Sequence, residues 1–180
     1  MSRIPALDPN AAHGKTAATL AAVGKLLGAT PNLFRVAAQA PAVLEGLVSL
    51  NGVVAQTSLG GRLAEAIALT VAEANGCDYC LSAHTALGAR AGLSAADLTH
   101  ARDAAGWDTK TTAVLRFARQ LVLERGRVSE RAVSAVREAG ATDAEILEIV
   151  TTVVLNVLTN YINLVADTEI DFPVVRTTAR

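Results

Sequence analysis

The sequence predicts an all-α protein, and three observations support this fold class. Half of the residues are hydrophobic (51%) but only 3% are aromatic, and Ala, Leu and Val dominate, which favours closely packed helices over a sheet sandwich. Apolar residues recur at helical spacing in several segments. Capping residues and glycine stops divide the chain into pieces of helical length.

The N-terminal third is predicted to contain a loop and three helices. Proline is favoured at the first position of a helix, and two of the predicted helices begin at a proline. The first helix is closed by Gly28. The loop extends to Gly14, and the helices cover about residues 15–27, 31–39 and 41–54. The pair Gly60-Gly61 is expected to end the turn that follows.

The middle of the chain is predicted to form a helical hairpin. Apolar positions recur at helical spacing over residues 62–75, and Gly76 suits a left-handed C-cap. A second helix is expected at about residues 78–91, where Gly92 stops it. Ser94 then provides an N-cap for a short helix.

Three helices are predicted in the C-terminal part. An amphipathic helix covers residues 114–126, and another covers 129–139. Residues 142–145 form a capping box for a last helix that continues beyond residue 163. The β-branched run at 149–154 favours a strand locally. We predict a helix there because the cap is strong and no turn residue interrupts the segment.

These elements predict one domain over residues 1–180. Its core lies at about residues 31–126, the C-terminal helices cover about 129–167, and the tail from Ile170 is irregular. The sequence contains no linker, low-complexity segment or fixed-period repeat that would divide the chain.

Charge and hydropathy argue against several classes of partner. The net charge is −1, and no Lys/Arg run with interleaved aromatic residues is present, so nucleic acid is not an expected partner. The N-terminus lacks an apolar signal segment, and asparagines interrupt the most apolar stretch, residues 149–165. We therefore expect a cytoplasmic protein that does not span a membrane. In that reducing compartment, a CxxC pair is more often redox-active or metal-bound than a permanent brace.

The only two cysteines belong to one motif, Cys77-Asp78-Tyr79-Cys80-Leu81-Ser82-Ala83-His84. On a helix, positions 77, 80 and 84 share one face, so both sulfurs and the imidazole lie within reach of one another. The pKa of a thiol falls near a helix N-terminus and beside a histidine. Cysteines at this spacing can form a disulfide after slight relaxation. Cys80 can therefore attack a substrate, and Cys77 can resolve the product.

Glu65 is the predicted base of this site. At about 1.5 Å per residue, it lies roughly 15 Å before the hairpin turn, and His84 lies roughly 10 Å beyond it. In an antiparallel hairpin the two side chains reach similar depth. Glu73, nearer to the turn, is expected to be a solvated end residue.

Redox chemistry is weighed against other uses of these residues. Two buried inert cysteines are disfavoured because the only cysteines of the chain stand at CxxC spacing. A zinc site is the stronger rival, although three ligands on one helix face converge poorly. Its ligands would be Cys77, Cys80, His84 and Glu65.

A polar stripe occurs on the last predicted helix, at Asn156, Asn160 and Asn163. It indicates buried hydrogen bonds between helices or a subunit contact, with a direct catalytic role as a less favoured reading. Together with the apolar helix that carries it, the stripe predicts a homo-oligomer. His13 and His100 lack a comparable context and are expected at the surface.

The stretch from Glu65 to His84 resembles the alkylhydroperoxidase AhpD-like branch of the carboxymuconolactone decarboxylase superfamily. The resemblance extends over most of the chain, to Pro31-Asn32-Leu33-Phe34, Gly92-Leu93-Ser94, the segment 160–167 and Asp171-Phe172-Pro173. It implies an all-helical fold that assembles into trimers or hexamers. It also implies a peroxidase that needs no haem, flavin or metal cofactor.

The resemblance implies a role for each residue of the motif. Cys80 would be the peroxidatic cysteine and Cys77 the resolving one, while Glu65 and His84 would form a proton relay. Tyr79 stands where the best-studied peroxidases of the branch carry a second histidine. Its hydroxyl can form hydrogen bonds, but with a pKa of about 10 it is a poor base at neutral pH. This predicts either a shorter relay or a lower activity.

The expected substrates are hydrogen peroxide or small organic hydroperoxides, and the electron donor is an unidentified thiol or dithiol. A transformation of a lactone or keto acid is the alternative on the same scaffold, because a fold does not determine a function. The decarboxylases proper lack the CxxC pair, so this alternative is less favoured.

Overall fold

A computed structural model describes residues 2–178 and confirms the all-α fold. Within that range, nine α-helices and one 3-10 turn follow one another. The elements are η1 (Pro9–Ala11), α1 (Gly14–Leu27), α2 (Asn32–Ala37), α3 (Pro41–Val54), α4 (Gly60–Asn75), α5 (Asp78–Arg90), α6 (Ala95–Arg102), α7 (Thr109–Leu123), α8 (Glu130–Glu138) and α9 (Asp143–Ala166).

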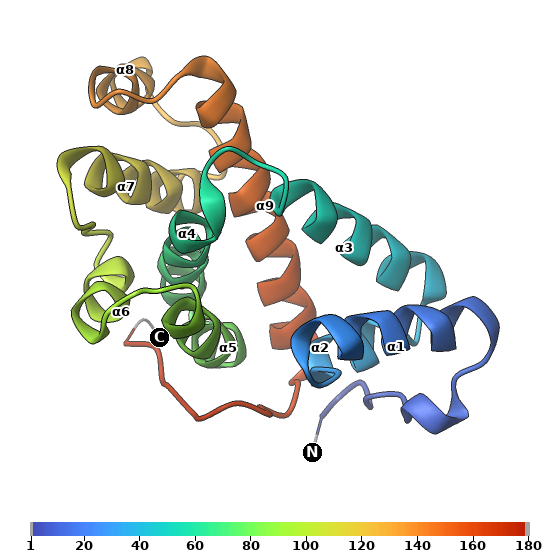
Figure 1. The fold of residues 1–180 in the computed structure, drawn as a ribbon. Coiled ribbons are helices and arrows are strands. Elements are labelled where there is room, and N and C mark those ends of the chain that lie inside the picture. The colour runs from blue at the N-terminus through green and yellow to red at the C-terminus, as the bar shows by residue number, and fades with distance from the viewer. Residues whose placement is uncertain (1, 179–180) are drawn as a thin grey trace.

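Helix α9 runs through the middle of the molecule, between two groups of helices (Figure 1). Helices α4 to α7 lie on one side of it, and α1 to α3 lie on the other. Helix α4 packs against α5, α6, α7 and α9. The α4–α5 hairpin, which carries the cysteine motif, is therefore held on several sides.

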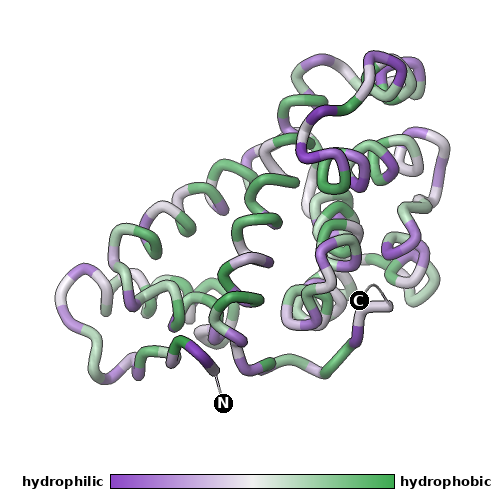
Figure 2. The backbone as a smooth tube through the Cα atoms, turned by 180° about the vertical axis from the view of Figure 1, so that it is seen from behind, coloured by the Kyte–Doolittle hydropathy of each residue, from purple (hydrophilic) through white to green (hydrophobic). Residues whose placement is uncertain are grey.

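Two hydrophobic clusters form the interior. The larger one lies around α4, α5 and α7 and includes the fully buried Leu69, Leu81 and Leu115. The smaller one lies among α1 to α3 and includes Leu155 of α9. Figure 2 shows apolar positions along most of α9. Because α9 contributes to both clusters, it joins the two groups of helices.

The β-branched segment of α9 is helical, as predicted. The capping box is formed, since the Glu145 amide donates to Thr142 Oγ1 over 3.1 Å and the Thr142 amide donates to the Glu145 carboxylate over 2.8 Å. Ile149 and Val153 are buried in the larger cluster. Burying such a side chain contributes about 1.5–3 kcal/mol, which outweighs the strand preference of a β-branched residue.

The hairpin turn is built around Gly76. Its φ of 66° and ψ of 32° place it in the left-handed region, which glycine adopts without the steric cost that a Cβ brings. The Cys77 amide then donates to the Ala72 carbonyl over 3.0 Å. The turn that follows α3 covers residues 55–59 and ends at Gly60-Gly61 as expected, and the same pair begins α4.

Helix α9 is long and apolar enough to cross a membrane by length and composition alone. However, half of its most apolar window is buried inside the protein, as expected of a helix that packs on both sides. The absence of a membrane partner stays a prediction.

Candidate active site

Both cysteines lie at the start of α5 and are free thiols. Cys77 is the N-cap residue, and its Sγ accepts a hydrogen bond from the Cys80 amide over 3.4 Å. Their exposed fractions are 1% and 2%. The partial positive charge at a helix N-terminus favours an anion there, so the first turn of α5 supports a thiolate.

Glu65 and His84 form a pair beside the cysteines. The antiparallel packing of α4 and α5 brings His84 Nδ1 to 2.8 Å from Glu65 Oε2. Both side chains are about one-fifth exposed. Burial alone lowers the pKa of His84, but the Glu65 carboxylate and the Cys80 sulfur raise it by more, so the net shift is upward. The pair therefore favours an imidazolium next to the thiols.

The two thiols differ in acidity. A hydrogen bond from Cys77 lowers the pKa of Cys80, burial raises it, and the charge of His84 lowers it again; the result is about 7, below the ordinary value of 9.0. The same hydrogen bond and burial raise the pKa of Cys77. Since the thiolate is the nucleophile, this environment makes Cys80 the reactive sulfur.

Two asparagines of α9 complete the surroundings of Cys80. Asn163 Nδ2 donates to Cys80 Sγ over 3.2 Å. Asn160 is fully buried, its Oδ1 accepts from Asn75 Nδ2 over 2.8 Å, and its own Nδ2 has no partner among residues 2–178. The bond from Asn163 also lowers the pKa of Cys80, as a donor to a charged form does.

The sequence pattern of the asparagine stripe indicates mainly helix–helix hydrogen bonding or a subunit contact. The bond between Asn160 and Asn75 and the bond from Asn163 to the Cys80 sulfur both join two helices, so both fit the first interpretation. The spacing indicates that the amides share a face, and only the position of α9 shows which group they meet. Asn156 instead donates to the Thr152 carbonyl within its own helix.

Tyr79 is buried beside the cysteines, but its hydroxyl is engaged elsewhere. It accepts a hydrogen bond from the Leu33 amide over 3.0 Å, and its ring meets Phe172 edge to face at 5.9 Å. Burial and the nearby Asp171 carboxylate raise its pKa. The side chain therefore stays protonated and links α5 to the start of α2 and to the C-terminal tail.

A cavity of about 530 Å³ opens beside Cys80. Cys80, His84 and Glu65 line it together with many apolar side chains, whereas Cys77 does not line it. Its size is in the range of small-molecule sites. The cavity therefore gives a substrate access to one of the two sulfurs.

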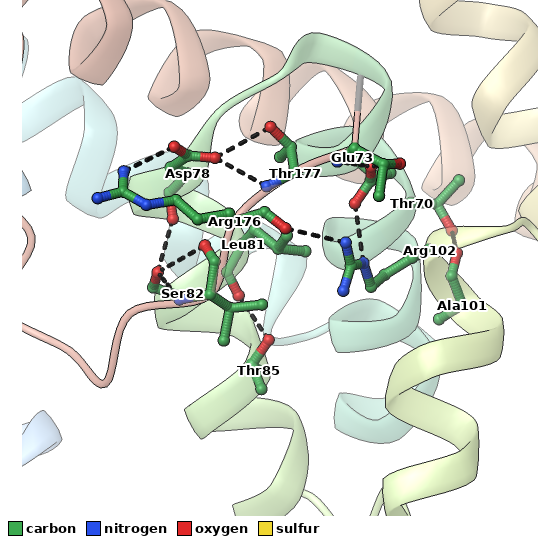
Figure 3. Close-up of polar contacts among 12 residues, drawn as sticks. Thr70, Glu73, Asp78, Leu81, Ser82, Thr85, Ala101, Arg102, Arg176 and Thr177 are labelled. Carbon is green, nitrogen blue, oxygen red and sulfur yellow. Dashed lines mark hydrogen bonds and ion pairs between the residues drawn. The ribbon is translucent and has the colours of Figure 1, made fainter. Parts of the chain in front are cut away.

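The C-terminal tail, residues 167–178, forms one wall of this cavity and is anchored to α5 (Figure 3). The Asp78 carboxylate accepts from Arg176 Nη1, and from the amide and hydroxyl of Thr177, over 2.8–2.9 Å. The Val175 amide donates to Ser82 Oγ over 2.9 Å. These bonds hold the preceding Asp171-Phe172-Pro173 segment against the cavity.

Glu73 is not a solvated end residue, so that expectation is wrong. It is 7% exposed and accepts from Arg102 Nε over 2.8 Å and from the Thr178 amide over 2.6 Å. The tail covers it, and that contact joins residues 105 positions apart. Glu73 is thus a further anchor of the tail.

The zinc alternative finds no support in the described part of the chain. Among residues 2–178, no group of three or more His, Cys, Asp or Glu side chains is arranged to hold a metal ion. The proposed ligands point to different partners, because the Glu65 carboxylate is bonded to His84 and Cys77 interacts with Cys80.

Comparison with known proteins finds a family match within the chain. Residues 41–123, from α3 to α7, match the carboxymuconolactone decarboxylase family. The matched segment contains the α4–α5 hairpin with Glu65, both cysteines and His84. A search of curated proteins finds no match.

Solved structures share the fold over nearly the whole chain. A peroxidase-related protein from Ralstonia eutropha JMP134, described as an alkylhydroperoxidase AhpD core, is 23% identical with a TM-score of 0.83, covering 94% of this chain and 92% of its own. A peroxidase-related protein from Silicibacter sp. TM1040 is 21% identical with a TM-score of 0.80, covering 92% and 91%. A cysteine-to-alanine variant of the debrominase Bmp8, in complex with 2,3,4-tribromopyrrole, is 17% identical with a TM-score of 0.81, covering 93% and 91%.

Proposed function

We propose that this protein, whose residues 41–123 match the carboxymuconolactone decarboxylase family, is a cofactor-free thiol peroxidase for hydrogen peroxide or small organic hydroperoxides. The observation that carries the proposal is the environment of Cys80. Its thiol has a pKa lowered to about 7 and lines a cavity that the second thiol does not line. The His84–Glu65 pair stands beside it as an acid–base group.

In the first step, the Cys80 thiolate attacks the outer oxygen of the hydroperoxide. A sulfur–oxygen bond forms, the oxygen–oxygen bond breaks, and the leaving alkoxide takes a proton from the His84 imidazolium. Glu65 bonds to Nδ1, which leaves Nε2 as the nitrogen that can exchange this proton. The products are Cys80 sulfenic acid and an alcohol, or water when hydrogen peroxide is the substrate and hydroxide is the leaving group.

In the second step, Cys77 condenses with the sulfenic acid. The Cys77 sulfur bonds to the Cys80 sulfur, and the sulfenic oxygen leaves as water. Cys77 keeps its proton in the resting state because its pKa is raised, so it does not compete for the substrate. An external thiol or dithiol then reduces the disulfide and is itself oxidised.

Rapid mixing of the reduced protein with hydroperoxides tests this proposal. We expect oxidation faster than that of a free thiol, with loss of two hydrogens from the intact mass. Cys80→Ser should abolish peroxide consumption. Cys77→Ser should complete one turnover and then accumulate a sulfenic acid that can be trapped. A protein whose thiols react no faster than free cysteine would contradict the proposal.

Reductive dehalogenation is a second candidate, favoured by the fold shared with the debrominase and by a cavity that can hold a ring. The same dithiol would supply two electrons. The halogen would leave as halide, hydrogen would replace it on the ring, and the cysteines would form a disulfide. Halide release from a brominated pyrrole, without consumption of hydroperoxide, would favour this activity over the peroxidase.

A further inference from the structure

The cavity is larger and more apolar than the smallest peroxides require. Hydrogen peroxide is only slightly larger than water, which occupies about 30 Å³, whereas the cavity measures about 530 Å³. Apolar side chains from several helices and the tail line it, among them Leu33, Phe34, Leu87, Leu155 and Phe172. Walls of this kind fit a substrate with a sizeable apolar body.

One charged side chain of the cavity lining, Arg90, forms no ion pair among residues 2–178. Glu65 pairs with His84, and the Asp171 carboxylate accepts from the Asn32 amide over 2.8 Å. Arg90, in contrast, lines the cavity but forms none of the ion pairs found among residues 2–178. Its guanidinium is therefore available to a ligand.

The end of α5 does not occupy Arg90 either. The last carbonyls of the helix accept hydrogen bonds from the turn that follows, since the Ala91 amide donates to Leu87 and the Leu93 amide donates to Gly88, each over 2.9 Å. These carbonyls therefore need no guanidinium as a cap.

Arg90 and Cys80 mark the two ends of one helix face. Cys80, Ala83, Leu87 and Arg90 are spaced by three or four residues along α5 and all line the cavity. Cys80 lies in the first turn of the helix and Arg90 is its last residue, about 15 Å further along the axis. The reactive sulfur is buried, and the arginine is exposed at the other end.

We propose that this cavity binds hydroperoxides that combine an apolar chain with a carboxylate, and that Arg90 holds the carboxylate. The peroxide group then reaches Cys80 while the chain lies along the apolar walls. Arginine suits this role because its planar guanidinium can pair with both oxygens of a carboxylate. The inference rests on the proposed peroxidase function and specifies its substrate class.

Matched substrates test the proposal. The kcat/KM for ω-hydroperoxydecanoic acid should exceed that for its methyl ester in the unchanged protein. Arg90→Leu should lower kcat/KM for the acid about fivefold, the scale of a partly exposed ion pair, and leave the values for the ester and for tert-butyl hydroperoxide unchanged. Arg90→Lys should retain part of the preference because it keeps the charge.

Arg119→Leu is the control, since Arg119 is an exposed arginine of α7 that does not line the cavity. Equal kcat/KM values for acid and ester in the unchanged protein, or an equal loss for both in Arg90→Leu, would overturn the proposal.

Calorimetric binding of decanoate separates the carboxylate proposal from the peroxidase proposal. If no hydroperoxide reacts, but decanoate binds and Arg90→Leu weakens that binding, only the peroxidase proposal fails. If the Arg90→Leu protein binds decanoate as well as the unchanged protein does, the carboxylate site is refuted.

Discussion

At the scale of single residues, the reactivity of Cys80 depends on hydrogen bonds and charges of the neighbouring side chains. The hydrogen bond with Cys77 has the largest effect in lowering the pKa of Cys80. The Glu65 carboxylate raises the pKa of His84, and the positive charge of the imidazolium lowers the pKa of Cys80 further. Cys80 is therefore expected to be mostly thiol below pH 7 and mostly thiolate above it. Reactivity toward an alkylating agent should rise with pH and reach half of its maximum near pH 7.

Removing the Glu65 carboxylate should move this curve. In Glu65→Gln the pKa of His84 falls, the ring loses its charge near neutral pH, and the pKa of Cys80 rises. The peroxidase rate at neutral pH should drop by roughly 10²-fold, the lower range for loss of a general base. The measurement is the pH dependence of Cys80 alkylation, and superimposable curves for the two proteins would show that Glu65 is only structural.

Asn163 is expected to act on the same thiolate by hydrogen bonding. Asn163→Leu removes the donor that lies 3.2 Å from the sulfur, so the midpoint of alkylation should rise by about one pH unit, as for one hydrogen bond to a charged group. Asn156→Leu is the control, because Asn156 belongs to the same helix and lines the cavity, but its amide bonds within α9. Equal midpoints for both variants would refute this role of Asn163.

At the scale of elements, the α4–α5 hairpin depends on the conformation of Gly76. Gly76→Ala places a Cβ at a φ of 66° and should lower the free energy of unfolding by about 1–2 kcal/mol. Gly52→Ala should instead raise the free energy of unfolding, because Gly52 lies inside α3 with open space for a Cβ. Alanine stabilises a helix interior by about 0.5–1 kcal/mol relative to glycine. Urea unfolding measures both, and a stabilised Gly76→Ala protein would contradict this account of the turn.

At the scale of the whole molecule, one face of α9 remains apolar and exposed. Val154, Leu158, Tyr161 and Val165 are spaced by three or four residues and are 39–63% exposed, next to an apolar groove of about 380 Å³. The asparagines do not belong to this face, because all three are buried. The face, not the stripe, thus supports the predicted homo-oligomer, since exposed apolar patches commonly mark interfaces.

Light scattering at micromolar concentration tests the assembly. We expect a mass of three or six times 18.6 kDa, and a smaller mass when Leu158→Asp and Tyr161→Asp are combined. Leu123→Asp is the control, because Leu123 is exposed at the end of α7, away from this face. A monomer mass for the unchanged protein would show that the prediction is wrong.

Local chemistry allowed the helices to be predicted from the sequence. Caps such as Thr142 and the left-handed Gly76 interact with residues only a few positions away. The helix ends that they form can therefore be recognised in the sequence alone. The same holds for Cys77, Cys80 and His84, which one helix carries at fixed spacing, and for Glu65 on the other arm of the hairpin.

Tertiary packing decided what surrounds that motif. The amide that meets the Cys80 sulfur comes from 83 residues further along the chain, and the tail that covers Glu73 comes from 105 residues further. No local pattern specifies such contacts, because they depend on where α9 and the tail lie after the core has formed. The acidity of Cys80 and the shape of the cavity follow from these long-range contacts, and for that reason they appear only in the folded protein.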